Sequence, residues 1–377
     1  MLVPTADPKP DRLVLTHEAP LRERGFFARL TLASRLAIAM ILLVAVTVTA
    51  TGWLYYLNLE RELLPRVLDR IETHSKLLAA DLQSYIRGSR ADVVTFRAHA
   101  AVHGIVLAHL NGGTDPVDGL TEEAWRQRLL TRLVAYLRAK PTYWQFRFIG
   151  LDDGHKEILR LDRSGPNGAV RVVPDSELQR IGDEPYVTET LKLAGDAMYV
   201  SPIDLNEDNG VIEEPQVPTL RVAAPVFKPD GTPFGVVAVS IDMRPALDRI
   251  RSSVQRGSIF AVDARGNYLV NPDRSLEFGA QLGRPADWRT HFPYFVPLLG
   301  SLQSAAQSAQ DPTGGLCGAA MAPAMIEGQQ WVGIIATIPN SVYMAPAVAI
   351  RNSALLVGSI AMLGAAALAV ILARSLT

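Results

Sequence analysis

The sequence predicts an α+β fold that is anchored in a membrane by two helices. Two apolar stretches, residues 36–57 and 352–373, carry no charged side chain. Between them the hydrophobic repeat changes from a period of three to four residues, typical of helices, to a period of two, typical of strands. The chain has 377 residues and a formal net charge of −1, so its charge does not favour nucleic acid as a partner.

Each apolar stretch has about the 20 residues that a helix needs to cross a bilayer. An excess of Arg beside a span marks its cytoplasmic side. Four Arg lie close before the first stretch: Arg22, Arg24, Arg29 and Arg35. We therefore expect a multi-pass protein in contact with membrane lipid, with the tail 1–35 on the cytoplasmic side and the central segment on the other side. A cleaved signal peptide is the alternative for the first stretch, but its apolar core would span only about 7–15 residues.

A long helix is predicted over residues 58–105, directly after the first span. Its apolar stripe is formed by Leu63, Val67, Ile71, His74, Leu78, Leu82 and Tyr85. A second helix is predicted over 122–139, with Thr121 as its N-cap. Small residues in the second span, such as Gly364, favour close helix packing, so we expect a homodimer.

Residues 106–243 read as a first α+β module. Strands are predicted at 143–149 and 157–163 with a hairpin turn at 152–154, then a helix at 185–193. Three more strands follow at 197–201, 219–227 and 234–242, and the last two are joined by a Pro-Asp-Gly turn at 229–231.

A smaller module is predicted over 244–345. It begins with a connecting helix at 245–254 and contains strands at 258–263, 268–270 and 330–337. Residues 300–328 are rich in Ala, Gln, Ser and Gly and are predicted to form a mobile loop. The single cysteine, Cys317, lies in that loop and excludes an internal disulfide.

Three stretches together resemble a known family: 143–160, 199–221 and 266–279. The chain resembles the double-PAS-like (dCache) extracytoplasmic sensor domain of bacterial transmembrane histidine kinases. The resemblance implies a tandem PAS-like fold, with a ligand pocket in a membrane-distal module (106–243) and a membrane-proximal relay module (244–345). Residues 374–377 resemble the start of a HAMP relay.

Polar side chains on the predicted strands of the distal module are the candidate ligand-binding residues. They are Gln145, Arg147, Arg160, Asp162, Tyr186, Tyr199, Arg221 and Asp242. The planar guanidinium of Arg suits a carboxylate, so a small anionic or zwitterionic ligand is expected. The alternatives are that Arg147 and Arg160 form internal salt bridges, and that Asp242 caps the connecting helix.

No metal site, cofactor or catalytic residue is predicted. The acidic segment 204–210 resembles the start of a calcium loop but lacks Gly at the sixth and Glu at the twelfth position. His99 and His103 lie one helical turn apart but have no third ligand nearby.

The predicted function is the periplasmic input region of a transmembrane receptor, most simply a two-component sensor histidine kinase. The sequence contains no kinase or cyclase signature, so the enzymatic output would lie outside it. The input domain of a diguanylate cyclase or of a methyl-accepting chemoreceptor is the alternative. A membrane scaffold that binds no ligand is the second alternative.

Overall fold

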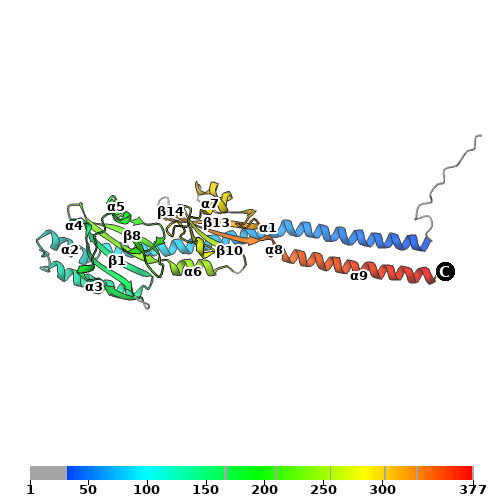
Figure 1. The fold of residues 1–377 in the computed structure, drawn as a ribbon, viewed down its shortest axis with the longest axis horizontal. Helices are drawn as coiled ribbons and strands as arrows, with labels where there is room; N and C mark the ends of the chain where they lie inside the picture. The colour runs from blue at the N-terminus through cyan, green and yellow to red at the C-terminus, as the bar shows by residue number, and fades with distance from the viewer. Residues whose placement is uncertain are drawn as a thin grey trace, which may run out of the picture. The chain divides into compact units, whose positions relative to one another are not determined.

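The computed structural model describes residues 32–164, 168–208, 210–254, 256–300, 303–327 and 330–375 (Figure 1). The chain divides into two compact units. One comprises the described residues up to Leu59 together with those from Pro346, and the other comprises Glu60–Ala345. Most of the predicted tail 1–35, and the last two residues of the predicted relay segment, lie outside the described residues.

Two helices are long and apolar enough to cross a membrane, by length and composition. Helix α1 (Leu32–Arg97) contains the first apolar stretch, and Pro65 lies inside it. Helix α9 (Ala345–Ser375) contains the second stretch. Within this unit Gly358 lies against Val48, where an added Cβ would come within 2.6 Å of the valine Cγ1.

The predicted helix 58–105 is wrong at its C-terminal end. Helix α1 ends at Arg97, and α2 (Ala100–Leu110) begins after His99. The backbone of His99 is extended, and its Nδ1 accepts a hydrogen bond from the Ala101 amide at 3.1 Å. This side chain therefore caps a new helix rather than continuing the old one. The next helix, α3 (Glu122–Ala139), has the predicted bounds and the predicted Thr121 cap.

An antiparallel seven-stranded sheet follows, in the order β3-β2-β1-β9-β8-β4, with β5 also paired to β8. Its strands are β1 (Tyr143–Gly150), β2 (Glu157–Ser164), β3 (Ala169–Val172), β4 (Tyr199–Val200), β5 (Asp204–Leu205), β8 (Pro218–Phe227) and β9 (Pro233–Asp242). The predicted hairpin between β1 and β2 is present, but a short helical turn, α4 (Asp152–His155), makes the connection.

The two faces of this sheet have different partners. Apolar side chains of one face, including Phe146 and Phe148, share a core with residues of α1, α2 and α3. The other face is covered by α5 (Pro185–Leu191), by a segment containing the 3₁₀-helix η2 (Asp175–Glu177), and by a small hairpin of β6 (Glu207–Asp208) and β7 (Val211–Ile212). The sheet therefore has a helix face and a pocket face.

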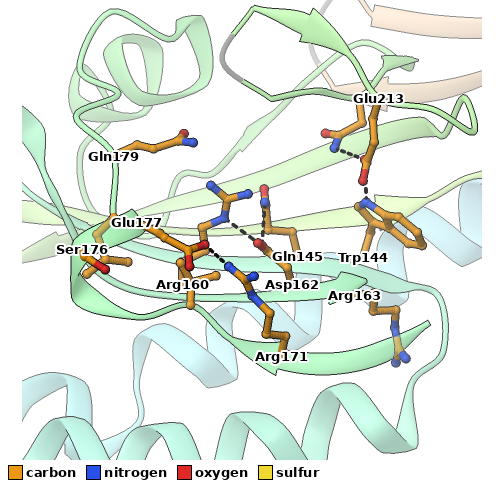
Figure 2. A pocket seen from close by; sticks show the side chains of 13 residues that line it. Trp144, Gln145, Arg160, Asp162, Arg163, Arg171, Ser176, Glu177, Gln179 and Glu213 are labelled. Carbon is orange, nitrogen blue, oxygen red and sulfur yellow. Dashed lines mark hydrogen bonds and ion pairs between the residues drawn. The ribbon is translucent and has the colours of Figure 1, made fainter. Parts of the chain in front are cut away.

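A β-bulge at Trp144 breaks the strict alternation of β1. Tyr143 pairs with Ile241 and Gln145 pairs with Ser240, so β1 has one more residue here than β9. Tyr143 consequently joins the core on the helix face, whereas Gln145 lies on the pocket face. The extra residue, Trp144, directs its indole toward the pocket side as well (Figure 2).

Helix α6 (Arg244–Ser252) leads to an antiparallel five-stranded sheet in the order β11-β10-β14-β13-β12. Its strands are β10 (Ser258–Asp263), β11 (Tyr268–Val270), β12 (Ala305–Gln310), β13 (Leu316–Glu327) and β14 (Gln330–Pro339). One face is covered by Leu276 of η3 (Arg274–Leu276) and by aromatic side chains of α7 (Trp288–His291), of η4 (Pro293–Gly300) and of Phe292 between them. Trp288, Phe292 and Phe295 are fully buried. The short helix α8 (Asn340–Tyr343) then precedes α9.

The prediction of a mobile loop at 300–328 is wrong, because β12 and β13 occupy most of it. Cys317 lies on β13 and is 1% exposed. The small residues have a packing role: a Cβ on Gly318 would lie 3.3 Å from Cδ2 of Leu68 on α1. The Ala-rich sequence therefore forms a sheet surface on which a helix can lie closely, rather than a loop.

Candidate ligand-binding site

A cavity of about 590 Å³ lies on the pocket face of the seven-stranded sheet (Figure 2). Most of the side chains around it are polar. They are Trp144, Gln145, Arg160, Asp162, Arg163, Arg171, Val173, Ser176, Glu177, Leu178, Gln179, Asn206 and Glu213. Its volume lies within the range of about 300–1,000 Å³ that small-molecule sites occupy.

Gln145 and Asp162 form the centre of the cavity floor. They are direct partners across β1 and β2, and Arg160 lies two residues before Asp162 on the same face. Asp162 Oδ1 accepts hydrogen bonds from Gln145 Nε2 and from Arg160 Nε, both at 2.8 Å. The amide oxygen of Gln145 in turn accepts from Arg147 Nε at 2.7 Å. The floor is thus a hydrogen-bonded row that leads away from the cavity toward Arg147.

Arg147 belongs to a buried cluster beside the cavity. Its Nη1 donates to the hydroxyl of Tyr186 on α5 at 3.2 Å, and its Nε lies 3.3 Å from Glu157 Oε1. Burial raises the pKa of Glu157, and the positive charge of Arg147 opposes this rise. The guanidinium of Arg221 on β8 lies 5.6 Å from the ring centroid of the same tyrosine. Tyr186 is therefore held between two arginines.

The residues on either side of the β6–β7 hairpin, Asn206 and Glu213, form one wall. Glu213 Oε2 accepts hydrogen bonds from Trp144 Nε1 at 3.0 Å and from Asn206 Nδ2 at 2.8 Å. The side-chain oxygen of Asn206 accepts from Arg221 Nη2 at 2.8 Å. Asn206 thus connects this wall to the buried cluster, as Gln145 connects the floor to it.

The segment Val173–Gln179 forms the opposite wall and is fastened by charge pairs. Arg126 on α3 binds Asp175, and Arg171 on β3 binds Glu177. The Arg126 guanidinium holds the pKa of Asp175 below its usual range. The Gln179 amide also donates to Glu157 at 2.9 Å. Ion pairs near the surface contribute little each, so the backbone hydrogen bonds from Val173 to Arg160 and from Glu157 to Gln179 hold the two ends of this wall.

The eight predicted residues separate into three groups. Gln145, Arg160 and Asp162 line the cavity. Arg147, Tyr186 and Arg221 form the buried cluster next to it, with Tyr199 packed against the apolar residues around Tyr186. Asp242 lies elsewhere.

The carboxylate of Asp242 binds the Arg244 side chain, with hydrogen bonds of 2.7 and 3.0 Å, and accepts from the Arg244 amide at 2.9 Å. It therefore lies at the start of α6, as its alternative interpretation predicts, although Met243 is the N-cap residue. The salt bridges considered for the two arginines also form: Arg147 with Glu157 and Arg160 with Asp162.

Sequence reasoning missed Trp144, Asn206 and Glu213. Trp144 is brought in by the bulge, and the other two by a hairpin of two-residue strands, neither of which leaves a clear periodic signal. A polar Asn-Glu pair around a turn before a long strand was the available signal.

The part of the chain that the structure describes contains no cluster of three or more metal-ligating side chains. His99 is the N-cap of α2, and its Nδ1 is occupied by the hydrogen bond from the Ala101 amide. In the acidic segment, Asp204 pairs with Arg265 instead of facing a cation site.

A family model described as the sensor domain of bacterial histidine kinases matches residues 120–297. Among curated proteins, none matches the chain. Solved structures with a similar fold include a domain of a sensory box/GGDEF family protein from Vibrio parahaemolyticus, with a TM-score of 0.58 and 16% identity over 76% of this chain and 99% of that one.

Two further structures come from other receptor classes. The extracellular domain of a protein described as a histidine kinase has a TM-score of 0.56 and 16% identity, and covers 75% of this chain and 96% of its own. The periplasmic sensory domain of the Campylobacter jejuni chemoreceptor Tlp1 has a TM-score of 0.54 and 11% identity, and covers 76% and 99%. At these identities the structures show the fold, which is tandem PAS-like. The predicted resemblance and fold class are confirmed: residues 120–297 match the histidine kinase sensor domain model, and the fold is similar to that of tandem PAS-like sensor domains.

Proposed function

We propose that this chain is the periplasmic input region of a transmembrane receptor, and that it binds a small ligand in the cavity on the seven-stranded sheet. One observation carries the proposal: a polar cavity lies on one face of a sheet whose other face packs on α1. Only the thickness of the sheet then separates a ligand on the pocket face from α1, the helix that contains the first apolar stretch.

The lining favours a small anionic or zwitterionic ligand. Arg160 offers the planar guanidinium that suits a carboxylate, and Asp162 and Gln145 fix its orientation. Three basic residues (Arg160, Arg163 and Arg171) and three acidic residues (Asp162, Glu177 and Glu213) line the cavity. A ligand that carries both signs of charge matches this balance.

Transmission would pass through β1. Next to the bulge, the hydroxyl of Tyr143 donates to Asp92 on α1, and Lys140 binds the same carboxylate. Gln145, two residues further along β1, lies in the cavity floor. A ligand that prefers one position of β1 would therefore prefer one position of α1, and only such a difference in affinity shifts a receptor between states.

The test is a ligand screen on the full chain in lipid nanodiscs, read out by thermal stabilisation. Amino acids, carboxylates and amines are compared, and hits are repeated with Arg160→Ala. We expect the substitution to abolish stabilisation by the hits. Arg147→Ala should weaken the stabilisation as well, because Arg147 donates the hydrogen bond that fixes the side-chain amide of Gln145. Full stabilisation of Arg160→Ala by every hit would contradict the proposed site.

We also propose a two-span topology in the inner membrane, with the tail and residues 374–377 in the cytoplasm. The Arg excess before the first span supports this orientation. Reporter fusions test it. A reporter that works only in the periplasm should be active when it is fused after Glu177, in the cavity wall. Activity of a reporter that works only in the cytoplasm, fused at the same position, would contradict the topology.

A homodimer through α1 is the proposed assembly. Outward positions of α1 recur at steps of four and three and are all exposed: Thr73, Leu77, Ala80, Ser84, Arg87, Ala91 and Val94. Such spacing is typical of a coiled-coil seam. Leu77 is 65% exposed, and Leu77→Glu should convert dimers to monomers in light scattering, whereas the matched Leu110→Glu on α2 should not.

The kinase parent is preferred over a diguanylate cyclase or chemoreceptor because the family model that matches is that of histidine kinase sensors. A scaffold that binds no ligand would be expected to cover its sheet with packed apolar side chains. The polar cavity argues against that alternative.

A further inference from the structure

Glu213 differs from the other acidic residues of the cavity. Asp162 pairs with Arg160, and Glu177 pairs with Arg171. In the ion pairs of the described residues, Glu213 has no basic partner. Its two recorded donors, the Trp144 indole and the Asn206 amide, are neutral. They fix the carboxylate in place without an ion pair, and the nearby positive charge of Arg244, which attracts it, is shared with Asp242.

The arginines nearest to this wall are already bound to other groups. Arg244 lies over the Trp144 ring, 5.1 Å from its centroid, but Asp242 holds its guanidinium. Arg221 donates to Asn206. A carboxylate held rigidly at a cavity wall by neutral donors is suited to a cationic group of a ligand.

The position of Glu213 also limits the length of the ligand. The sheet residues Asp162, Gln145, Ser240 and Arg221 form one row across β2, β1, β9 and β8. This row covers three strand spacings, or about 14 Å. Arg160 lies at the β2 end, whereas Glu213 is joined through Asn206 to Arg221 at the β8 end and through the Trp144 indole to β1, so the row gives the upper limit of the separation. Figure 2 shows Arg160 and Glu213 at different sides of the cavity.

We propose that Glu213 binds the ammonium group of an elongated ligand whose acidic group lies at Arg160, so that the ligand class is that of ω-amino acids. An α-amino acid separates its two charges by a single carbon and does not reach both ends. This inference rests on the proposed function of the cavity. It assigns to Glu213 the amine contact for which the sequence had suggested Asp242.

The test uses the full chain in nanodiscs and isothermal titration with 4-aminobutyrate, 6-aminohexanoate and 8-aminooctanoate. For each length, the carboxylate without the amine is titrated as well. We expect the best amino acid to bind at least about tenfold more tightly than its parent carboxylate, since a hydrogen bond between charged groups has that order of effect. Glu213→Gln should remove this advantage and leave the parent carboxylate unchanged.

Glu213→Gln separates recognition from structure. The Gln oxygen still accepts from Trp144 and Asn206, so the wall should stay in place and the unfolding midpoint should not change. Glu214→Gln is the matched control, because Glu214 is the exposed neighbour of Glu213. This variant should bind all compounds as the natural chain does.

Three results would overturn the inference. They are equal binding of amino acid and parent carboxylate, unchanged amino acid binding by Glu213→Gln, or no binding of any amino acid up to about 10 mM, where affinity is too weak for a sensor. A carboxylate that requires Arg160 but ignores Glu213 would refute the amine contact and leave the proposed function standing.

Discussion

The contact between Phe96 on α1 and Phe146 on β1 provides a direct test of the link between the sensor sheet and the long helix. Their ring centroids lie 5.5 Å apart with an interplanar angle of 88°, an edge-to-face pair. Both side chains are buried, with exposed fractions of 3% and 0%. Such pairs stabilise by about 0.5–1.5 kcal/mol beyond the area that they bury.

A double-mutant cycle isolates this contribution. Phe96→Leu, Phe146→Leu and the double variant keep apolar side chains at both positions, so the cycle reports the ring contact rather than a large cavity. The full chain is unfolded by urea and followed by near-ultraviolet circular dichroism. We expect a coupling energy of about 1 kcal/mol, which changes the folded-to-unfolded ratio about fivefold.

A control cycle pairs Phe96→Leu with Phe292→Leu. Phe292 belongs to the separate aromatic core of the five-stranded sheet. Residues without shared contacts add within about 0.3–0.5 kcal/mol, so this second cycle should show no coupling. Coupling energies that are equal in the two cycles would refute a specific contact between β1 and α1.

Three further predictions concern packing and titration. Gly104→Ala should destabilise the chain by about 1–3 kcal/mol in urea unfolding, because its Cβ would lie 2.3 Å from Trp125 Cε2; a loss below that range would mean that the indole moves aside freely. Burial raises the pKa of Cys317 to about 11, so a thiol reagent at pH 8 should modify it only as fast as the chain unfolds. Burial also raises the pKa of Glu157 above that of an unfolded carboxyl, so its contribution to stability is largest at low pH and is lost as the pH rises through that folded pKa. Glu157→Gln should remove this slope from the pH dependence of the unfolding free energy, and an unchanged slope would contradict the assignment.

The sequence predicts the long strands well because each combines alternation with an identifiable turn. Gly231 illustrates this: its φ is 84°, and the Lys228 amide donates to Thr232 across the predicted turn. By contrast, Ala is the commonest residue of β12 and β13, and Ala has low strand propensity. The sheet that they form packs against α1, which is far away in the sequence. A short sequence window therefore cannot identify this partner.

Part of the candidate site is equally accessible from sequence. Alternation places Gln145 and Arg147 on one face, and the structure confirms this for both. Which of them reaches the cavity depends on what covers the sheet, since α5 supplies Tyr186 above Arg147. Glu213 arrives from a hairpin whose position is set by hydrogen bonds to Trp144 and Asn206, so only the folded chain identifies it.

Because of the extra residue at Trp144, side chains of one strand, β1, contact two different partners. Before the bulge, Tyr143 packs in the core on the helix face, and after it Gln145 lines the cavity. Side chains that line the cavity can therefore be substituted to change the ligand specificity, while the side chains that contact α1 stay the same. Regular pleating through residues 143–145 would merge the two roles, because Tyr143 and Gln145 would then lie on the same side of the sheet.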